Sequence, residues 1–278
     1  MLSKIKKLCF GYSPCPNDTF VFYALAHQLI DTAPFEFEIQ HHDIATLNHL
    51  AFDRMLDLTK ISLFTYGHIR QSYALLPVGA ALGKGYGPLV LTSNTADRDP
   101  AKWKIGLPGR YTTAHLLAHL WNPEMRDPVF LPFHRIITEL AAGRLDAGIV
   151  IHESRFTYEK QGLVLHTDLG CWWQEMTQLP LPLGGICVSR TFSVEIRHHL
   201  GALIKDSLEY AYDHPQESLD YIKQHAQEND EIALRQHIDL YVNEYTKNLG
   251  EEGIEAVEFL LRKAQKLGLI PEFAIGLF

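Results

Sequence analysis

The sequence predicts an α/β protein with two lobes. Strand-like and helix-like patterns alternate from residue 7, and the alternation restarts at residue 103 after the polar segment 94–100. From residue 194 onward the hydrophobic pattern is helical only. We therefore expect two α/β lobes around a ligand cleft, two crossings of the chain between them, and a helical C-terminal tail.

The first alternating stretch begins with a predicted strand at 7–12 and a turn that contains Pro14 and Pro16. The prolines end the strand, and Asn17 or Asp18 can cap the helix that follows. The rest of this stretch predicts strands at 35–41, 57–61 and 89–92, helices at 44–54 and 63–71, an extended segment at 73–78 and a glycine-rich loop at 79–87.

The second alternating stretch ends when the apolar run 181–189 carries the chain back to the first lobe. We expect lobe I to comprise 1–94 and 189–278, and lobe II to comprise 95–188. The predicted elements are strands at 103–107, 129–131 and 148–152, helices at 114–121 and 133–142, an extended segment at 163–166, and tail helices at 194–213, 215–227, 230–242 and 251–267.

The composition argues against several classes of partner. The net charge is −8 and no Lys/Arg block is present, which argues against a nucleic-acid partner. No apolar run has membrane-spanning length, and the basic start is followed by too short an apolar run for a signal peptide. The four cysteines form no C-x-x-C pair. We expect reduced thiols, no membrane insertion and a cytoplasmic location.

A buried strand delivers one histidine, His152, into the polar run Glu153, Ser154 and Arg155. The carboxyl end of a strand in an open α/β fold faces the ligand crevice, and an imidazole there can act as a general base. The alternative is a hydrogen-bonded histidine without a catalytic role. Glu153 could orient the imidazole of His152, but adjacent residues of a strand point to opposite sides. For Glu153 we therefore favour a surface ion pair with Arg155. Arg155 could itself meet a substrate carboxylate.

Further candidates follow three other predicted strands. Helix starts offer N–H groups and a positive dipole end, which suit a carboxylate, although the same side chains can serve only as caps. Lys60 is expected to be solvated by default, but it shares a strand face with Ser62. The candidate substrate-binding residues are Asn17, Thr19, Lys60, Ser62, Thr112 and Thr113.

Two other motifs resemble a dinucleotide-binding loop and a zinc site, but the residues around them argue against both. Gly83-x-Gly85-x-Gly87 precedes a strand instead of opening a helix, so it is not a dinucleotide loop. His115 and His119 have zinc-pair spacing, but Leu116 replaces the glutamate of H-E-x-x-H. We therefore predict no metal site. For Trp172 and Trp173 we favour packing over stacking on a planar ligand.

Taken in order, the motifs resemble the 1,4-dihydroxy-6-naphthoate synthase family of the futalosine route to menaquinone. The resemblance covers nearly the whole chain. The motifs that carry it are SPCPNDTF at 13–20, TKIS at 59–62, GxGxGPLV at 83–90, PGRxTTA at 108–114, IHESRFTY at 151–158, DLGxWW at 168–173 and LPLPLG at 179–184.

The resemblance implies a two-lobed fold like the type II periplasmic solute-binding proteins and a cytosolic enzyme. It implies a lyase that cleaves a carbon–carbon bond of cyclic dehypoxanthine futalosine, a small carboxylate, with His152 as base and no metal or organic cofactor. Two alternatives stay open: a chorismate dehydratase-like enzyme, and a cytosolic protein of the same fold that only binds a small carboxylate. The sequence also leaves a homodimer open.

Overall fold

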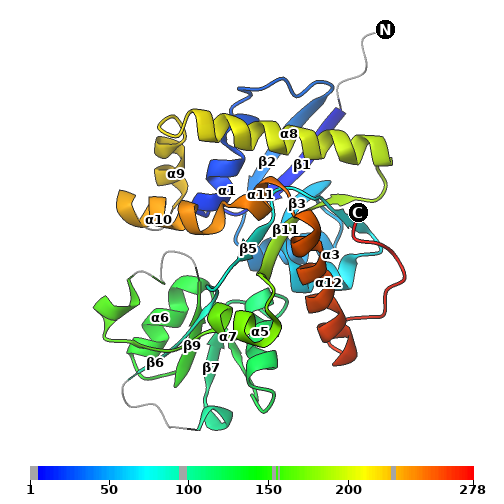
Figure 1. Ribbon diagram of the computed structural model, residues 1–278. Helices are drawn as coiled ribbons and strands as arrows, with labels where there is room; N and C mark the ends of the chain where they lie inside the picture. The colour runs from blue at the N-terminus through cyan, green and yellow to red at the C-terminus, as the bar shows by residue number, and fades with distance from the viewer. Residues whose placement is uncertain (1–5, 94–98, 152–154, 156, 227–229) are drawn as a thin grey trace.

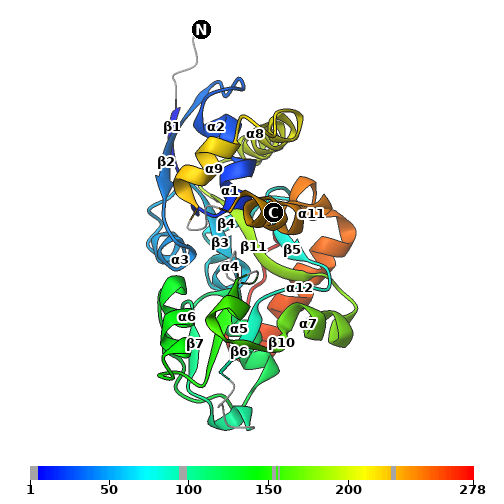
Figure 2. The same cartoon turned by 90° about the vertical axis from the view of Figure 1, so that its left-hand side faces the viewer.

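The computed structural model describes residues 6–93, 99–151, 155, 157–226 and 230–278. Its strands form two separate sheets, each with its own helices (Figure 1). We call the part built on the first sheet the first lobe and the part built on the second sheet the second lobe. A view turned by 90° shows the same division into an upper and a lower body (Figure 2). The expected two-lobed α/β architecture is confirmed.

The first sheet has the strand order β2-β1-β3-β11-β4, with β5 also paired to β11. Strands β1, β2 and β3 are parallel, and β11 runs antiparallel to β3, β4 and β5. Because β11 is buried along nearly its whole length, it reads as a continuous apolar run. The strands are β1 (Lys6–Tyr12), β2 (Phe35–His41), β3 (Leu58–Ser62), β4 (Tyr73–Leu75), β5 (Ala81–Gly83) and β11 (Leu181–Ser189).

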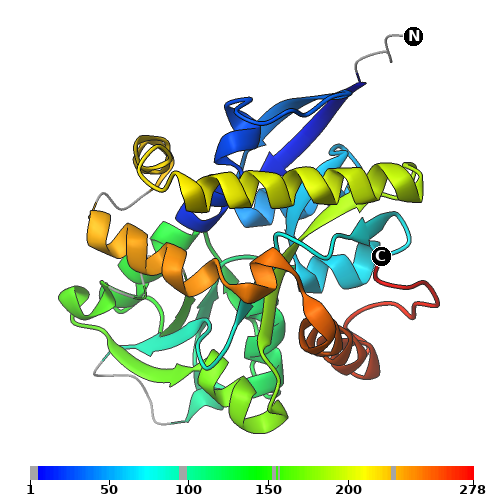
Figure 3. The same cartoon turned by 45° about the horizontal axis from the view of Figure 1, so that its top comes forward.

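Helices of the first lobe come from both ends of the chain. The long helix α8 (Val194–Asp213) crosses this lobe and packs on α1 and α2 (Figure 3). Asp43 caps helix α3 (Ile44–Phe52) with its carboxylate, and Ser193 caps α8 with its hydroxyl. The remaining helices are α1 (Pro16–Val21), α2 (Tyr23–Ala26), α3 (Ile44–Phe52), α4 (Leu63–Ile69), α9 (Leu219–His225), α10 (Glu231–Tyr241), α11 (Glu244–Lys247) and α12 (Gly250–Lys266).

The second sheet has the order β10-β6-β9-β7-β8. Strands β7, β8 and β9 are parallel, whereas β6 runs antiparallel to β9 and to β10. Its strands are β6 (Leu89–Thr92), β7 (Ile105–Leu107), β8 (Val129–Phe130), β9 (Ala147–Val150) and β10 (Val164–Asp168). Its helices are α5 (Thr113–Trp121), α6 (Phe133–Ala141) and α7 (Leu169–Thr177), with 3-10 turns at Pro100–Lys102 and Tyr158–Gln161.

The chain crosses between the sheets earlier than the sequence indicated at both places. The prediction ended the first part of lobe I at residue 94, but β6 (Leu89–Thr92) already pairs with β9 and β10 of the second sheet. It also placed 181–188 in lobe II, whereas β11 pairs with β3 and β4 of the first sheet. The first crossing is the tight glycine turn between β5 and β6, and not the polar segment that begins at residue 94.

Gly170 explains why that turn has no room for larger residues. A Cβ atom built on Gly170 would lie 1.9 Å from the carbonyl carbon of Tyr86, and one built on Gly87 would lie 2.7 Å from the backbone nitrogen of Gly170. The turn and the start of α7 are therefore packed backbone against backbone. The glycine repeat is a close-packed crossing between the lobes and not a phosphate loop.

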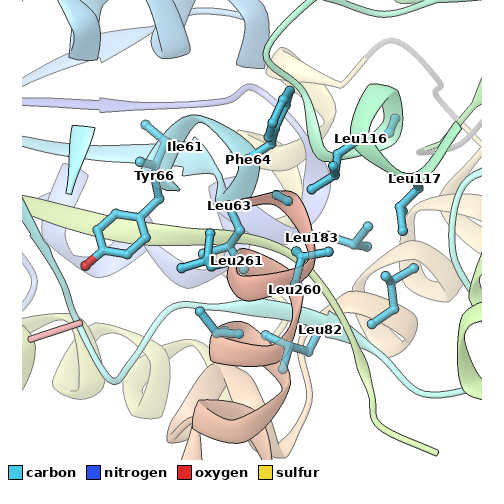
Figure 4. Packing of buried hydrophobic residues seen from close by; sticks show 14 of the residues in the cluster. Ile61, Leu63, Phe64, Tyr66, Leu82, Leu116, Leu117, Leu183, Leu260 and Leu261 are labelled. Carbon is cyan, nitrogen blue, oxygen red and sulfur yellow. The ribbon is translucent and has the colours of Figure 1, made fainter. Parts of the chain in front are cut away.

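The largest hydrophobic core continues from one lobe into the other. It combines side chains of β3, α4, α5, β11 and α12, including the contact between Leu183 and its neighbours shown in Figure 4. The labelled members are Ile61, Leu63, Phe64, Tyr66, Leu82, Leu116, Leu117, Leu183, Leu260 and Leu261. Trp173 is also buried in this core, and its indole N–H donates to the carbonyl of Pro180, so its position is that of a packing residue.

Three short elements were not predicted. Helix α7 follows Asp168, whose carboxylate accepts from two N–H groups of its first turn, and this capping signal was present in the sequence. Strand β5 has only three residues and α11 only four, too short for a periodic pattern. None of the helices in the described part of the chain is long and apolar enough to cross a membrane.

Candidate active site

A cavity that is partly open to solvent lies between the two sheets; the empty space within it, open solvent included, is about 630 Å³. Its wall comes from both lobes and from the helical tail. The first lobe contributes Ser13, Asn17, Asp18, Ile44, Lys60, Ile61, Ser62, Ala81, Leu183 and Gly184; the second contributes Pro88, Pro108, Thr112, Thr113, Ala114, Phe133 and Ile151; and helix α10 contributes His237 and Tyr241. The cleft is therefore lined by five of the predicted binding residues.

Lys60 is not the solvated lysine expected by default. Its side chain is 8% exposed, and its Nζ lies 2.9 Å from Oδ1 of Asp18 and 3.3 Å from the carbonyl oxygen of Gly79. Strand β3 places Lys60 inside the sheet, where a charge needs a partner. This pair could not be predicted from local sequence, because Asp18 lies on a helix 42 residues before Lys60 in the chain.

Asp18 is the centre of a polar cluster at the start of α1. Its Oδ2 accepts from the hydroxyl and the backbone N–H of Ser13, and its Oδ1 accepts from Nδ2 of Asn17. The carboxylate therefore holds the lysine, the serine and the asparagine in place. The prediction that Asn17 or Asp18 caps this helix is wrong. The cap position is Cys15, which makes no side-chain cap bond, and Pro16 is the first residue of the helix.

His237 extends this cluster from the other end of the chain. It is fully buried, and its Nε2 lies 2.9 Å from Oδ1 of Asn17. Since Nδ2 of Asn17 donates to Asp18, Oδ1 is the amide atom that accepts, and Nε2 of His237 carries a proton. His237 and Tyr241 were not among the predicted site residues. The available signal was that the two residues are four apart on α10, the spacing that places side chains on one helix face.

Ser62 ends β3 and precedes α4, as predicted. Asn48 holds it on both sides: Nδ2 of Asn48 donates to the Ser62 hydroxyl over 3.1 Å, and the Ser62 N–H donates to Oδ1 over 3.0 Å. The described residues offer no acceptor for the proton of this hydroxyl. Ser62 therefore faces the cavity with a donor to spare.

Thr112 and Thr113 both line the cavity, but their hydroxyl protons are already used. Thr112 caps α5 and donates to the carbonyl of Gly109. Thr113 donates to the carbonyl of Leu183 over 2.6 Å and accepts from the N–H of Phe64 over 3.3 Å. Phe64 lies in the first turn of α4, where N–H groups lack helical partners. Thr113 of the second lobe thus caps a helix of the first.

The remaining candidates lie elsewhere. Thr19 is fully buried beneath the turn, and its hydroxyl donates to the carbonyls of Cys15 and Pro16 instead of lining the cavity. Arg155 donates to the Gly87 carbonyl over 2.7 Å and pairs with Asp168 over 3.0 Å. His152 and Glu153 lie outside the described residues. Ile151, the residue before His152, lines the cavity.

The described wall offers three free hydrogen-bond donors, from Lys60, Ser62 and Tyr241. Lys60 has three N–H groups, of which two are used, and Ser62 retains its proton. Burial raises the pKa of Tyr241 to about 12, against the opposing effect of the Arg155 charge, so this phenol is also a donor at neutral pH. Among the residues described, no group of three or more His, Cys, Asp or Glu side chains could hold a metal ion.

Solved structures with the same architecture support the fold. A crystal structure of protein AF1704 from Archaeoglobus fulgidus is 36% identical, with a TM-score of 0.89 over 95% of this chain and 98% of that one. The alkanesulfonate-binding protein SsuA from Xanthomonas axonopodis pv. citri, bound to MOPS, is 12% identical, with a TM-score of 0.74 over 97% and 96% of the two chains. The chain has a periplasmic-binding-protein-like fold.

Sequence relatives identify the family. A 1,4-dihydroxy-6-naphthoate synthase of Thermus thermophilus is 42% identical over 269 residues, which cover 95% of this chain and 96% of the relative. The enzyme of the same name from Streptomyces coelicolor is also 42% identical, over 95% of this chain and 95% of the relative. A family model described as menaquinone biosynthesis matches residues 8–266. The chain therefore belongs to the menaquinone biosynthesis family.

Proposed function

We propose that this enzyme of menaquinone biosynthesis forms 1,4-dihydroxy-6-naphthoate from cyclic dehypoxanthine futalosine. The observation that carries the proposal is the cavity between the lobes, whose largely apolar wall carries a few free hydrogen-bond donors and suits a small carboxylate with a ring system. Two relatives that are 42% identical to this chain, over 95% or more of their own length, have the name of this synthase. Because these relatives are biosynthetic enzymes, we also propose a cytoplasmic location.

The proposed reaction is a carbon–carbon lyase step with His152 as base. Neutral His152 removes a proton from the sugar-derived part of the substrate. The electron pair of that C–H bond forms a new double bond within the sugar-derived part, and the bond between this part and the ring breaks. The pair released from the broken bond passes to the ring, which becomes aromatic, and this drives the step forward. The imidazolium then returns its proton to the product anion, so the step needs no oxidant or reductant, and we propose that it proceeds without a metal or organic cofactor.

The described residues support this chemistry by binding and positioning. Lys60 and Ser62 each present a free donor to the cavity and are the proposed contacts of substrate oxygens. Asn17 orients His237 and Asp18, and Asp18 orients Lys60. Thr112 and Thr113 can only accept from the ligand, because their protons serve backbone carbonyls. Thr19 supports the turn from beneath.

Incubation of the purified protein with cyclic dehypoxanthine futalosine tests the proposal, with chromatographic detection of the fluorescent naphthoate. We expect product, and we expect the rate to be unchanged by a chelator such as EDTA. Binding of the substrate without product would favour the carboxylate-binding protein instead. Dehydration of chorismate by the same preparation would favour the dehydratase.

A further inference from the structure

Tyr241 is a cavity residue with an unused hydroxyl. It ends α10, it is 4% exposed, and it lines the space between the lobes. Its ring is fixed by an edge contact with Tyr86 at 5.8 Å and by the ring of His237 at 4.7 Å. Its hydroxyl has no hydrogen-bond partner among the residues that the structure describes.

An unpaired buried hydroxyl costs stability. Removing such a group from water without a partner costs about 1–3 kcal/mol, and a phenylalanine would fill the same space without this cost. The neighbouring Tyr86 shows the contrast, because its hydroxyl donates to the carbonyl of Leu240 and accepts from Asn243. A tyrosine at 241 is therefore expected to find its partner in a bound ligand.

The charges around Tyr241 indicate which ligand atom that is. The Arg155 guanidinium, held by Asp168 and by the carbonyl of Gly87, lowers the pKa of the Tyr241 phenol against the larger effect of burial. Arginine can only donate, so it leaves the phenol proton free. The phenol proton is therefore available to an acceptor on a ligand. A cation close to the phenol strengthens its bond to an anionic oxygen.

We propose that Tyr241 donates a hydrogen bond to the carboxylate of the bound substrate and thereby helps to select a carboxylate over an uncharged group. The assignment rests on the proposed function for the identity of the ligand. It makes the helical tail, through α10, part of the binding site. Tyr241 and Lys60 then supply donors to the ligand from two distant parts of the chain.

The test is the variant Tyr241→Phe, which removes one oxygen atom. Binding of 1,4-dihydroxy-6-naphthoate and of its 6-carboxamide is measured by calorimetry under anaerobic conditions. A hydrogen bond to a charged group contributes about 1.5–3 kcal/mol, so we expect the naphthoate to bind roughly 10- to 150-fold more weakly. The carboxamide, which can accept only a neutral hydrogen bond worth about 0.5–1.5 kcal/mol, is expected to lose roughly 2- to 13-fold and in any case less than the naphthoate. The matched control is Tyr245→Phe, whose hydroxyl bonds to Glu252 and not to the cavity.

Equal losses for the two ligands, or no loss for the naphthoate, would overturn the assignment. Thermal unfolding provides the second readout: the Phe variant should be at least as stable as the parent, because it buries no unpaired hydroxyl. A parent protein that makes no product but shows the Tyr241-dependent preference would overturn the proposed function and keep the assignment. If the parent makes product and Tyr241→Phe binds the naphthoate normally, the proposed function is kept and the role assigned to Tyr241 is overturned. A parent that binds neither ligand would overturn both.

Discussion

The ammonium group of Lys60 lies 2.9 Å from a carboxylate oxygen of Asp18, and neither side chain is more than 8% exposed. The pair connects β3 to the start of α1 at the wall of the cavity. Two charges removed from water depend on each other, so the loss of one leaves the other uncompensated.

Lys60→Met is therefore expected to lower the free energy of unfolding by about 3–5 kcal/mol, and Lys60→Met combined with Asp18→Leu by less than the sum of the two single changes. Urea unfolding of the single and double variants measures the coupling. The matched control is Lys7→Met, because Lys7 and Glu36 form an exposed pair at 3.8 Å. That change should cost at most about 1 kcal/mol. Additive effects of Lys60→Met and Asp18→Leu would contradict the coupling.

His152→Asn should leave substrate binding nearly unchanged and lower the turnover rate by about 10²–10⁴-fold, because it removes the proposed base. Stopped-time assays and calorimetry separate the two quantities. His214→Asn, at an exposed histidine, is the control and should turn over normally. If the His152 variant keeps near-full turnover, another group must take the proton.

Thr113→Val should destabilise the protein by about 1–3 kcal/mol, because it leaves the Leu183 carbonyl and the Phe64 N–H without their partner. Since these bonds join the lobes, substrate affinity should fall as well. Chemical unfolding and KM measure the two effects. Thr138→Val, on the exposed side of α6, is the comparison. A Thr113 variant as stable as this comparison would show that the bonds between the lobes contribute little.

The stability of the fold should fall as the pH decreases from about 6.5 toward 4. Burial, with smaller contributions from His225 and His42, lowers the pKa of His41 from 6.5 to about 4. Above pH 6.5 His41 is neutral in both states. Between the two values the unfolded chain binds a proton that the folded chain does not, so unfolding becomes more favourable.

Urea midpoints at pH 7.5 and pH 5 test this prediction. His41→Gln should reduce the difference between the two midpoints. It should not abolish the difference, because burial lowers the pKa of His68 and of His115 in the same direction. An unchanged difference in the His41 variant would mean that this histidine does not contribute to the pH dependence.

The architecture could be predicted because it depends on local patterns. Helix α8 and strand β11 were predicted with the bounds that the structure has, since a long amphipathic segment and a long apolar run are strong signals. The crossings were placed too late. The polar segment 94–100 suggests a linker, but the chain crosses in the turn between β5 and β6. A glycine of this turn, Gly87, packs against Gly170, which is far away in the sequence.

The cavity could be predicted only in part. Ser62, Thr112 and Thr113 follow strand ends, and a strand end is a place that the sequence reveals. The burial of Lys60 depends on Asp18, and the place of His237 and Tyr241 depends on how the tail packs across α1 and β5. Such contacts join distant segments, and a single sequence carries no local signal of them.

Strand β11 lies between β3 and β4 in the first sheet, yet it is synthesised after every strand of the second sheet, of which β10 ends at Asp168. During translation the second lobe can therefore complete its pairing while the first still lacks an interior strand. The first lobe must wait for Leu181–Ser189 to leave the ribosome. The binding cavity, which also needs α10, can be completed only after residue 241 has been synthesised, when most of the chain has left the ribosome.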